Sequence, residues 1–133
     1  MKYLLDTNTV IRHLNRRCEA LTARFHATPE EDIALCAVVK AEMLYGAMRS
    51  NNSAKTLAQQ RAFFSRFASL PFDDAAAEHY GRVRAHLATQ GTPIGPNDLM
   101  IASIALANGL ILVTHNTAEF GRVSGLQIED WEI

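Results

Sequence analysis

The sequence lacks the residue patterns that mark a membrane protein or a zinc site. No apolar stretch is long enough to span a bilayer, and the longest apolar-rich run, residues 99–107, contains Ser103. The two cysteines, Cys18 and Cys36, do not have metal-ligand spacing, and the five histidines form no His-x-x-His or His-x-x-x-His pair. These absences argue against zinc and against membrane insertion.

A targeting signal and an excess of basic charge are also missing. Residues 1–2 lead directly into an apolar run, without the basic region, apolar segment and cleavage site of a secretory signal, so we expect a cytoplasmic location and reduced thiols. The net charge of −1 gives no electrostatic indication of nucleic-acid binding. A total charge does not report how the 13 basic residues are distributed, so RNA remains open as a partner.

The 133 residues, 48% hydrophobic and 20% charged, suit one soluble globular domain spanning residues 1–133. Short apolar runs predict strands at residues 3–5, 33–36 and 110–114, and an edge strand at residues 126–128. Helical periodicity predicts helices at residues 37–48, about 54–68, from Asp73 or Asp74 to Gly91, and 96–108. The alternation of strands and helices predicts an α/β fold whose mostly parallel sheet is covered on both faces.

Asp6 follows the predicted strand at residues 3–5 and precedes three small polar residues. Asp6 therefore lies at the carboxyl end of a strand, which is the edge where open α/β sheets bind ligands. A carboxylate is costly to desolvate there unless a cation or hydrogen-bond donors neutralise it. Taken alone, Asp6 is equally well explained as a helix cap.

Glu42 lies on an apolar face of the helix predicted for residues 37–48. Its neighbours one turn away include Val38 and Tyr45, and a glutamate rarely occupies such a face without a specific partner. A functional acid is one interpretation. The other is a buried ion pair with an arginine such as Arg12.

Asp98 lies in the first turn of the helix predicted for residues 96–108, where the helix dipole favours an acid. Capping alone accounts for such a residue. The helix that follows is almost wholly apolar, so we expect it to be buried in the middle of its layer. The N-terminus of such a helix usually opens onto the ligand crevice, which makes Asp98 a candidate site residue.

Asn116 is a fourth polar position, two residues past the strand predicted for residues 110–114. Asp6, Glu42, Asp98 and Asn116 are able to converge on one pocket at the carboxyl edge of the sheet. Three carboxylates there repel one another by roughly 3 kcal/mol per pair at about 5 Å, for an effective dielectric constant of about 20. A hard divalent cation removes this repulsion, and all-oxygen ligands favour Mg²⁺ or Mn²⁺ over zinc.

These residues belong to four short motifs, which are Leu5-Asp6-Thr7-Asn8, Ala41-Glu42-Met43-Leu44-Tyr45-Gly46-Ala47, Pro96-Asn97-Asp98-x-x-Ile101-Ala102 and Val113-Thr114-His115-Asn116-x-x-Glu119-Phe120. In this order the motifs resemble the four acidic motifs of PIN-domain ribonucleases. The closest likeness is to the VapC toxins of bacterial toxin–antitoxin pairs. The resemblance covers essentially the whole chain, including the closing Glu129-Asp130-Trp131.

The resemblance implies a PIN-like three-layer α/β/α fold with a mostly parallel sheet of four to five strands. It implies a Mg²⁺-dependent endoribonuclease, with Mn²⁺ as an alternative ion, that acts on structured RNA such as tRNA. It further implies a homodimer, a VapB-type antitoxin that holds the toxin inactive, and a higher toxin–antitoxin complex. The implied catalytic group consists of Asp6 and Asp98 as metal ligands, Glu42 as the second acid and a third ligand, and Asn116 at a variable fourth position, with Thr7 and Thr114 lining the pocket.

Two departures from the family pattern bear on this site. Asn116 is an amide where many PIN domains have Asp, which weakens a second metal site. Glu119 either supplies the missing charge as a pocket-lining residue or faces solvent, and we favour solvent. Residues 36–39 are apolar or Cys where relatives tend to carry hydroxyl groups, which leaves open how the helix at residues 37–48 is capped.

The implied reaction is in-line attack of a metal-activated water on a phosphodiester, with Glu42 as the candidate to orient or deprotonate the water. Two other interpretations start from the same residues. Phosphatases of the haloacid-dehalogenase type also have an aspartate after the first strand, but they need a second one two residues later, where this chain has Asn8. In the remaining interpretation, the acids only hold together the fold of an RNA-binding or scaffold protein.

Overall fold

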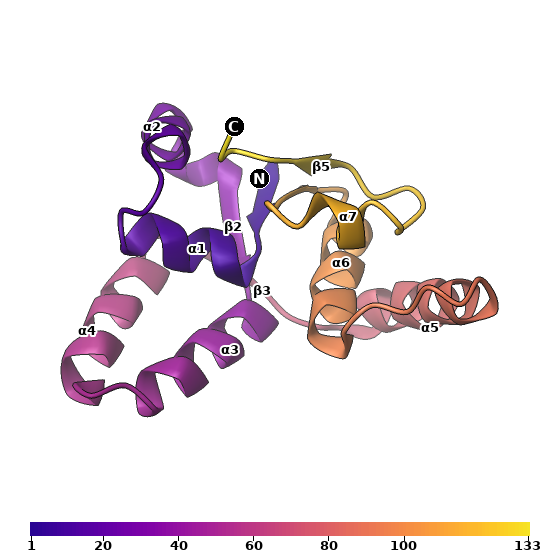
Figure 1. Ribbon diagram of the computed structural model, residues 1–133, viewed down its shortest axis with the longest axis horizontal. Helices are drawn as coiled ribbons and strands as arrows, with labels where there is room; N and C mark the ends of the chain where they lie inside the picture. Colours follow the sequence, from indigo (N-terminus) through magenta and orange to yellow (C-terminus); the bar gives the residue numbers. More distant parts are fainter.

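The computed structural model describes residues 1–133 and is organised around one sheet of five strands (Figure 1). The strands are β1 (Tyr3–Leu5), β2 (Ile33–Cys36), β3 (Ala68–Leu70), β4 (Ile111–Val113) and β5 (Ile128–Glu129). Their order across the sheet is β3-β2-β1-β4-β5, and every neighbouring pair is parallel. The first strand of the chain is therefore the central strand of the sheet.

Helices connect the strands and cover both faces of the sheet. They are α1 (Thr7–Leu14), α2 (Glu19–Ala27), α3 (Ala37–Met48), α4 (Ser53–Phe64), α5 (Asp74–Thr89), α6 (Pro96–Asn108) and the short α7 (Thr117–Phe120), with a 3-10 turn, η1, at Glu30–Asp32. Figure 1 shows α1 to α4 on one side of the strands and α5 to α7 on the other. The three-layer α/β/α architecture expected from the sequence is confirmed. None of these helices combines the length and the hydropathy needed to cross a membrane.

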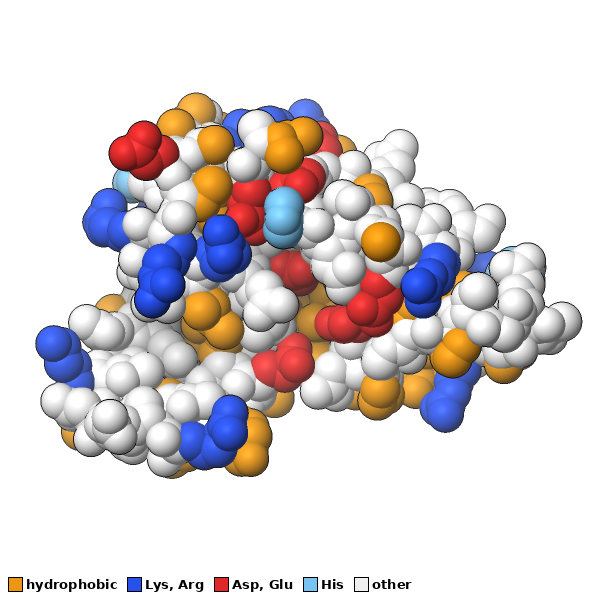
Figure 2. Space-filling model, viewed as in Figure 1, with side chains coloured by type: hydrophobic (Ala, Val, Ile, Leu, Met, Phe, Trp, Pro, Cys, Tyr) orange, Lys and Arg blue, Asp and Glu red, His pale blue; other side chains and the backbone are white.

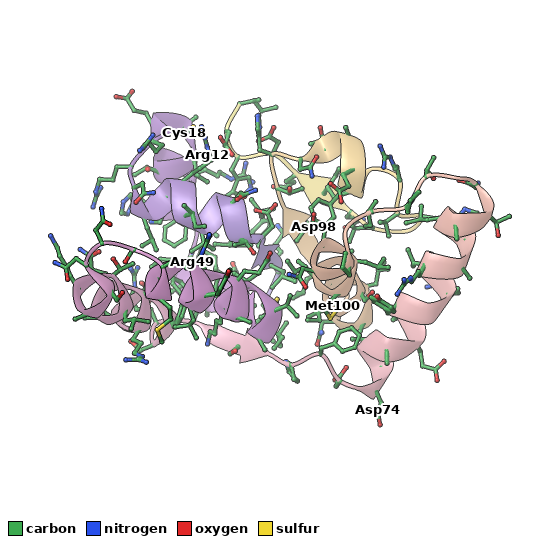
Figure 3. The ribbon with its side chains drawn as sticks, turned by 60° about the horizontal axis from the view of Figure 1, so that its bottom comes forward. Arg12, Cys18, Arg49, Asp74, Asp98 and Met100 are labelled. Carbon is green, nitrogen blue, oxygen red and sulfur yellow. The ribbon has the colours of Figure 1, made fainter.

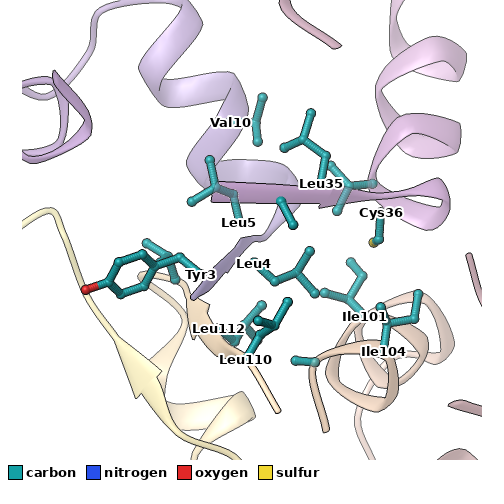
Figure 4. Packing of buried hydrophobic residues seen from close by; sticks show 14 of the residues in the cluster. Tyr3, Leu4, Leu5, Val10, Leu35, Cys36, Ile101, Ile104, Leu110 and Leu112 are labelled. Atoms are coloured by element: carbon teal, nitrogen blue, oxygen red, sulfur yellow. The ribbon is translucent and has the colours of Figure 1, made fainter. Parts of the chain in front are cut away.

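A cluster of 29 buried hydrophobic residues fills the space between the layers. Leu4 of β1 pairs in register with Leu112 of β4, and both side chains are 0% exposed. Figure 4 shows Ile101 and Ile104 of α6 packed close to them. Because β1 is buried on both faces, its residues are apolar throughout rather than alternating.

The strand order reverses at β1, since β2 pairs with one of its edges and β4 with the other. In open α/β sheets, the crevice at such a reversal, beyond the carboxyl ends of the strands, is the usual ligand site. The residues that follow β1 and β4 are Asp6 and Thr114, and α3 begins directly after β2 and packs against both α1 and α6. The fold therefore brings the four candidate segments to one edge of the sheet.

Most predicted boundaries agree with the observed ones, but the helix predicted for residues 54–68 is wrong at its end. Helix α4 stops at Phe64, and Ala68 begins β3, where it pairs with Ala34 of β2. The aromatic run that suggested a longer helix includes Phe67, which is 8% exposed and packs into the core from the turn between α4 and β3. Burial of an aromatic side chain thus does not require the helix to continue.

Two further strands differ slightly from the sequence prediction. The strand predicted for residues 110–114 is shorter, as Ile111–Val113, and the edge strand predicted for residues 126–128 lies at Ile128–Glu129. The strands at residues 3–5 and 33–36 and the helices at residues 37–48 and 96–108 have the predicted bounds. Helix α6 ends at Gly109, whose φ of +63° is a conformation that glycine adopts without strain.

We expect the substitution Leu4→Ala to lower the free energy of unfolding by about 2–5 kcal/mol, because it leaves a cavity in the central strand. Urea unfolding followed by circular dichroism measures this change. The matched control is Ile133→Ala, since Ile133 is 92% exposed and its removal is expected to leave stability nearly unchanged. Equal effects of the two substitutions would contradict the central position of Leu4.

Candidate functional site

Asp6 is both a helix cap and a buried acid at the crevice. Its side chain is the N-cap of α1, where Oδ1 accepts a hydrogen bond of 2.8 Å from the backbone N–H of Thr9. The residue is only 5% exposed, and burial raises the pKa of its carboxyl group although hydrogen bonds from Thr114 and Thr9 act in the opposite direction. Asp6 therefore does cap α1. A capping residue on the surface would not lose its hydration as Asp6 does, so capping alone does not explain its burial.

Thr114 fixes the other oxygen of Asp6. The hydroxyl group of Thr114 donates a hydrogen bond of 2.6 Å to Asp6 Oδ2, and Thr114 itself is fully buried at the end of β4. The same hydroxyl oxygen accepts a 3.0 Å hydrogen bond from the backbone N–H of Asn116. Thr114 thus links the acid after β1 to the turn after β4.

Glu42 is half-buried on α3 and is held by donors from two other helices. Thr7 Oγ1 donates to Glu42 Oε1 over 2.5 Å, and Asn97 Nδ2 lies 3.4 Å from Glu42 Oε2. An ion pair between Glu42 and Arg12 is not formed, because the Arg12 guanidinium pairs with Glu132 at 2.6 Å. Glu42 therefore faces α1 and the start of α6, where Asp98 lies.

Asp98 and Glu119 lie close enough for each to affect the ionisation of the other. Burial, followed by the charge and hydrogen bond of Glu119 and by the charges of Glu42 and Asp6, raises the pKa of Asp98 from 3.8 to about 7. Burial alone would raise the pKa of Glu119 as well, but hydrogen bonds from the Asn116 side chain and the Gly95 N–H hold it below its usual value. As the pH falls, Asp98 therefore takes up a proton before Glu119 does.

Glu119 is partly exposed to solvent, but two donors also hold its carboxylate group. Glu119 Oε1 accepts a hydrogen bond of 3.1 Å from the backbone N–H of Gly95, and Oε2 accepts one of 2.8 Å from Asn116 Nδ2. The short helix α7 turns the chain back, so that Glu119 meets the N-terminal end of α6. Asn116 therefore contacts Glu119, whose charge acts on Asp98.

Asp6 and Glu42 each line an open hollow rather than a closed cavity. Figure 2 shows acidic side chains gathered between α1 and α3 on one side and α6 and α7 on the other, with one histidine among them. One hollow of about 390 Å³ is lined by Asp6, Asn116 and Glu132, together with Arg12 and His115. Asp6, Asn116 and Glu132 offer side-chain oxygen atoms to this hollow, which is the ligand chemistry that suits a hard divalent cation.

Some residues of this region were not identified from the sequence. Asn97 approaches Glu42, and its place beside Asp98 at a helix start is the sequence signal that indicates such a role. His115, Asp130 and Glu132 each offer one ligand atom within 4.8 Å of the other two. No sequence spacing indicates this second group, because His115 lies far from Asp130 and Glu132 along the chain.

Comparison with known proteins gives a consistent family assignment. Residues 3–126 match the family model described as PIN domain. A relative from Shigella flexneri, named tRNA(fMet)-specific endonuclease VapC, is 43% identical over 131 residues, which are 98% of each chain. Ribonuclease VapC2 from Haemophilus influenzae is 38% identical over 131 residues, again 98% of each chain.

Solved structures agree with this assignment. The toxin–antitoxin complex VapBC from Salmonella typhimurium, crystallised bound to DNA, contains a chain that matches with a TM-score of 0.93 at 40% identity and 98% coverage of both chains. VapBC2 from Rickettsia felis, bound to a promoter DNA fragment, matches with a TM-score of 0.90 at 33% identity, covering 98% of this chain and 99% of that one. The chain therefore belongs to the VapC group of the PIN-domain family.

Proposed function

We propose that the chain is a divalent-metal-dependent endoribonuclease toxin, with residues 1–133 as a single PIN domain, that hydrolyses phosphodiester bonds in structured RNA. The observation that carries the proposal is the crowding of carboxylates at one edge of the sheet, where burial and the charges of Glu119, Glu42 and Asp6 raise the pKa of Asp98 to about 7. tRNA is the proposed substrate class, supported by the name tRNA(fMet)-specific endonuclease given to the Shigella flexneri relative.

The proposed metal ligands are Asp6 and Asp98, with Glu42 as a third. Mg²⁺ is the proposed ion and Mn²⁺ the alternative, because these side chains offer only oxygen donors. Each Asp6 oxygen already accepts one hydrogen bond, which leaves lone pairs free on both. When bound, such an ion supplies a lowered pKa for a coordinated water and neutralises charge on the phosphoryl oxygens.

Glu42 is proposed to orient the attacking water and to accept its proton. Thr7 donates a hydrogen bond to one oxygen of the Glu42 carboxylate, and Asn97 of α6 contacts the other oxygen. A general base must be fixed within hydrogen-bond reach of the proton it removes. These two donors, from α1 and α6, restrict the rotation of the Glu42 side chain.

Thr114 and Asn116 are proposed to act as positioning residues. Thr114 holds Asp6 by a 2.6 Å hydrogen bond, and Asn116 holds Glu119 by a 2.8 Å hydrogen bond. Glu119, which lies close enough to Asp98 to raise its pKa, is proposed to contribute charge to the pocket. The two hydrogen-bond donors thus fix the positions of the acids without taking part in the chemistry.

A VapB-type antitoxin is the proposed partner, and it would neutralise the toxin in the cytoplasm. Support comes from the solved neighbours, which include VapBC complexes from Salmonella typhimurium, Rickettsia felis and Haemophilus influenzae. A homodimer and a higher toxin–antitoxin complex belong to the same proposal.

The two other interpretations fit the geometry less well. An aspartyl phosphatase uses its first aspartate as an accessible nucleophile, whereas Asp6 is 5% exposed and hydrogen-bonded through both oxygens, and Asn8 brings no second carboxylate. A purely structural role for the acids is disfavoured because burial raises the pKa of Asp6 and of Asp98. Their charged forms therefore lower stability unless a cation compensates them.

The experiment that tests the nuclease is incubation of the purified protein with total tRNA, in MgCl₂ or in EDTA, followed by mapping of the cut ends. We expect discrete cuts in MgCl₂ and none in EDTA.

Asp98→Asn is expected to reduce the cleavage rate to below about 1% of the wild-type rate. Loss of a residue that only hydrogen-bonds to a metal ligand typically lowers activity 10- to 100-fold, and loss of the ligand itself should lower it more. Asp74→Asn, at an exposed acid in the first turn of α5, is the control and should cleave normally. Stable RNA binding without any cleavage would favour the scaffold interpretation.

Glu42→Gln keeps the size of the side chain and removes its basic oxygen. The proposed role predicts a fall in cleavage rate of roughly 10²- to 10⁴-fold with little change in folding. Single-turnover cleavage of tRNA and calorimetric titration with Mg²⁺ measure the two functions of the residue separately. Glu78→Gln, at an exposed glutamate of α5, is the matched control. If Mg²⁺ binding and cleavage both survive Glu42→Gln unchanged, Glu42 has neither role.

The raised pKa of Asp98 predicts a dependence of stability on pH in EDTA. Because its folded pKa of about 7 lies above its ordinary value of 3.8, the protein should gain stability as the pH falls from 8 to 6.5. His13, whose pKa burial lowers to about 4, acts in the opposite direction as the pH approaches its ordinary value of 6.5, and the raised pKa of Asp6 acts in the same direction as that of Asp98. The contribution of Asp98 is therefore the difference between the wild-type protein and Asp98→Asn.

Urea unfolding at pH 8 and 6.5 measures the effect, and Asp98→Asn should remove most of it. Added Mg²⁺ should stabilise the wild-type protein more at pH 8 than at pH 6.5, since protons and the cation compete for one carboxylate. A wild-type protein whose stability is the same at both pH values in EDTA would contradict the raised pKa.

A further inference from the structure

A second hollow extends from Glu42 along α3 towards the carboxyl end of the helix. Its volume is about 700 Å³, and its walls include Glu42 and Tyr45 from α3, Arg49 directly after α3 and Met100 from α6. Figure 3 labels Arg49 and Met100. Residues 42, 45 and 49 are spaced by three and four positions, so they follow one face of the helix. The hollow therefore continues directly from the candidate active site.

Tyr45 is the most unusual residue of this hollow. Tyr45 lies one helical turn from Glu42, and this large aromatic residue is 64% exposed. The Arg49 guanidinium lies over the ring, with its Cζ atom 4.7 Å from the ring centroid. A cation over an aromatic ring covers one face of the ring, and the high exposure of Tyr45 leaves ring surface available for a ligand.

Arg49 is a cation without an anionic partner. The four ion pairs of the chain use Arg12, Arg24, Arg66 and His115, and none of them includes Arg49. Glu42 is the one acid in the wall of the hollow, and its two oxygens face Thr7 and Asn97. The guanidinium group is therefore free to bind an anion that enters the hollow.

We propose that Tyr45 and Arg49 form a nucleotide subsite for single-stranded RNA next to the cleavage site. A base stacks on the exposed surface of the Tyr45 ring, and Arg49 binds a neighbouring phosphate. Aromatic stacking accepts any base, while a guanidinium group matches the geometry of phosphate. This inference rests on the proposed nuclease function and deepens it by placing the substrate strand along α3.

Charge complementarity favours RNA over a protein as the occupant. The carboxylates around Asp98 repel a polyanion such as RNA, so a productive complex needs a compensating cation close by. Arg49 has no ion-pair partner and lies in the wall of the hollow that reaches Glu42. Exposed apolar side chains also lie on these helices, namely Ile11 at 37% and Met48 at 61% exposure. A protein partner that covers them is the competing outcome of the test.

The test uses the Asp98→Asn background, in which RNA binds without being cut, and a fluorescein-labelled transcript of tRNA(fMet) in MgCl₂. Fluorescence anisotropy should show that Tyr45→Ala weakens binding roughly 5- to 100-fold, the range for loss of one stacked base. Tyr45→Phe keeps the ring and should bind like the parent. Met48→Ala is the matched control, because Met48 is similarly exposed on the same helix but lies outside the walls of the hollow.

Arg49→Ala tests the phosphate contact by the dependence of binding on salt. Loss of one phosphate contact should reduce the slope of log affinity against log salt by about 0.7 to 0.9. In the active protein, Tyr45→Ala should raise the KM for tRNA, whereas Met48→Ala should not. An unchanged salt slope in Arg49→Ala would overturn the proposed contact.

The outcomes separate this inference from the nuclease proposal. If the Asp98→Asn parent binds tRNA and Tyr45→Ala binds it equally well, the subsite is wrong while the nuclease proposal stands. If Tyr45→Ala leaves RNA affinity unchanged but weakens binding of a VapB-type antitoxin, the surface belongs to a protein partner and the subsite is also wrong. If the parent binds no tRNA, the substrate class fails together with the subsite.

Discussion

The repulsion between carboxylates at the carboxyl edge of the sheet is the constraint on which the rest of the site depends. Burial and neighbouring charge raise the pKa of Asp98 to about 7, and burial raises the pKa of Asp6. Such a group spreads apart unless a rigid framework holds it. Here the framework is the parallel pairing of β1 with β4, and the α3 helix that packs against both α1 and α6. The stability of the core is thus what maintains an arrangement that is unfavourable in itself.

Neutral hydrogen-bond donors hold the carboxylates of the site in place. Thr9 and Thr114 donate to Asp6, Thr7 donates to Glu42, and Asn116 donates to Glu119. None of these donors is a cation, so they orient the carboxylates without neutralising them. Arg12, the arginine closest in sequence to Asp6, is held by Glu132 instead. The carboxylates therefore have no resident cationic partner, which distinguishes this arrangement from a network of ion pairs that stabilises a fold.

The sequence predicted the architecture and the convergence of Asp6, Glu42 and Asp98, because the ends of buried strands and helices follow from local apolar patterns. It did not predict the orientation of Glu119. That orientation depends on the four-residue helix α7 and on a contact with Gly95, 24 positions away. The group of His115, Asp130 and Glu132 also depends on a contact between distant parts of the chain, which local sequence patterns do not report. The end of α4 was misplaced because an aromatic side chain packs equally well from a turn.

The hydrogen bond between Thr114 and Asp6 joins residues 108 positions apart. Glu119 likewise meets Gly95 only after most of the chain has been made. On a ribosome, Asp6, Glu42 and Asp98 emerge before the residues that hold Asp6 from β4 and place the fourth acid beside Asp98. A nascent chain consequently carries three of the acids without their final arrangement. Assembly of the complete site is therefore a late event of synthesis.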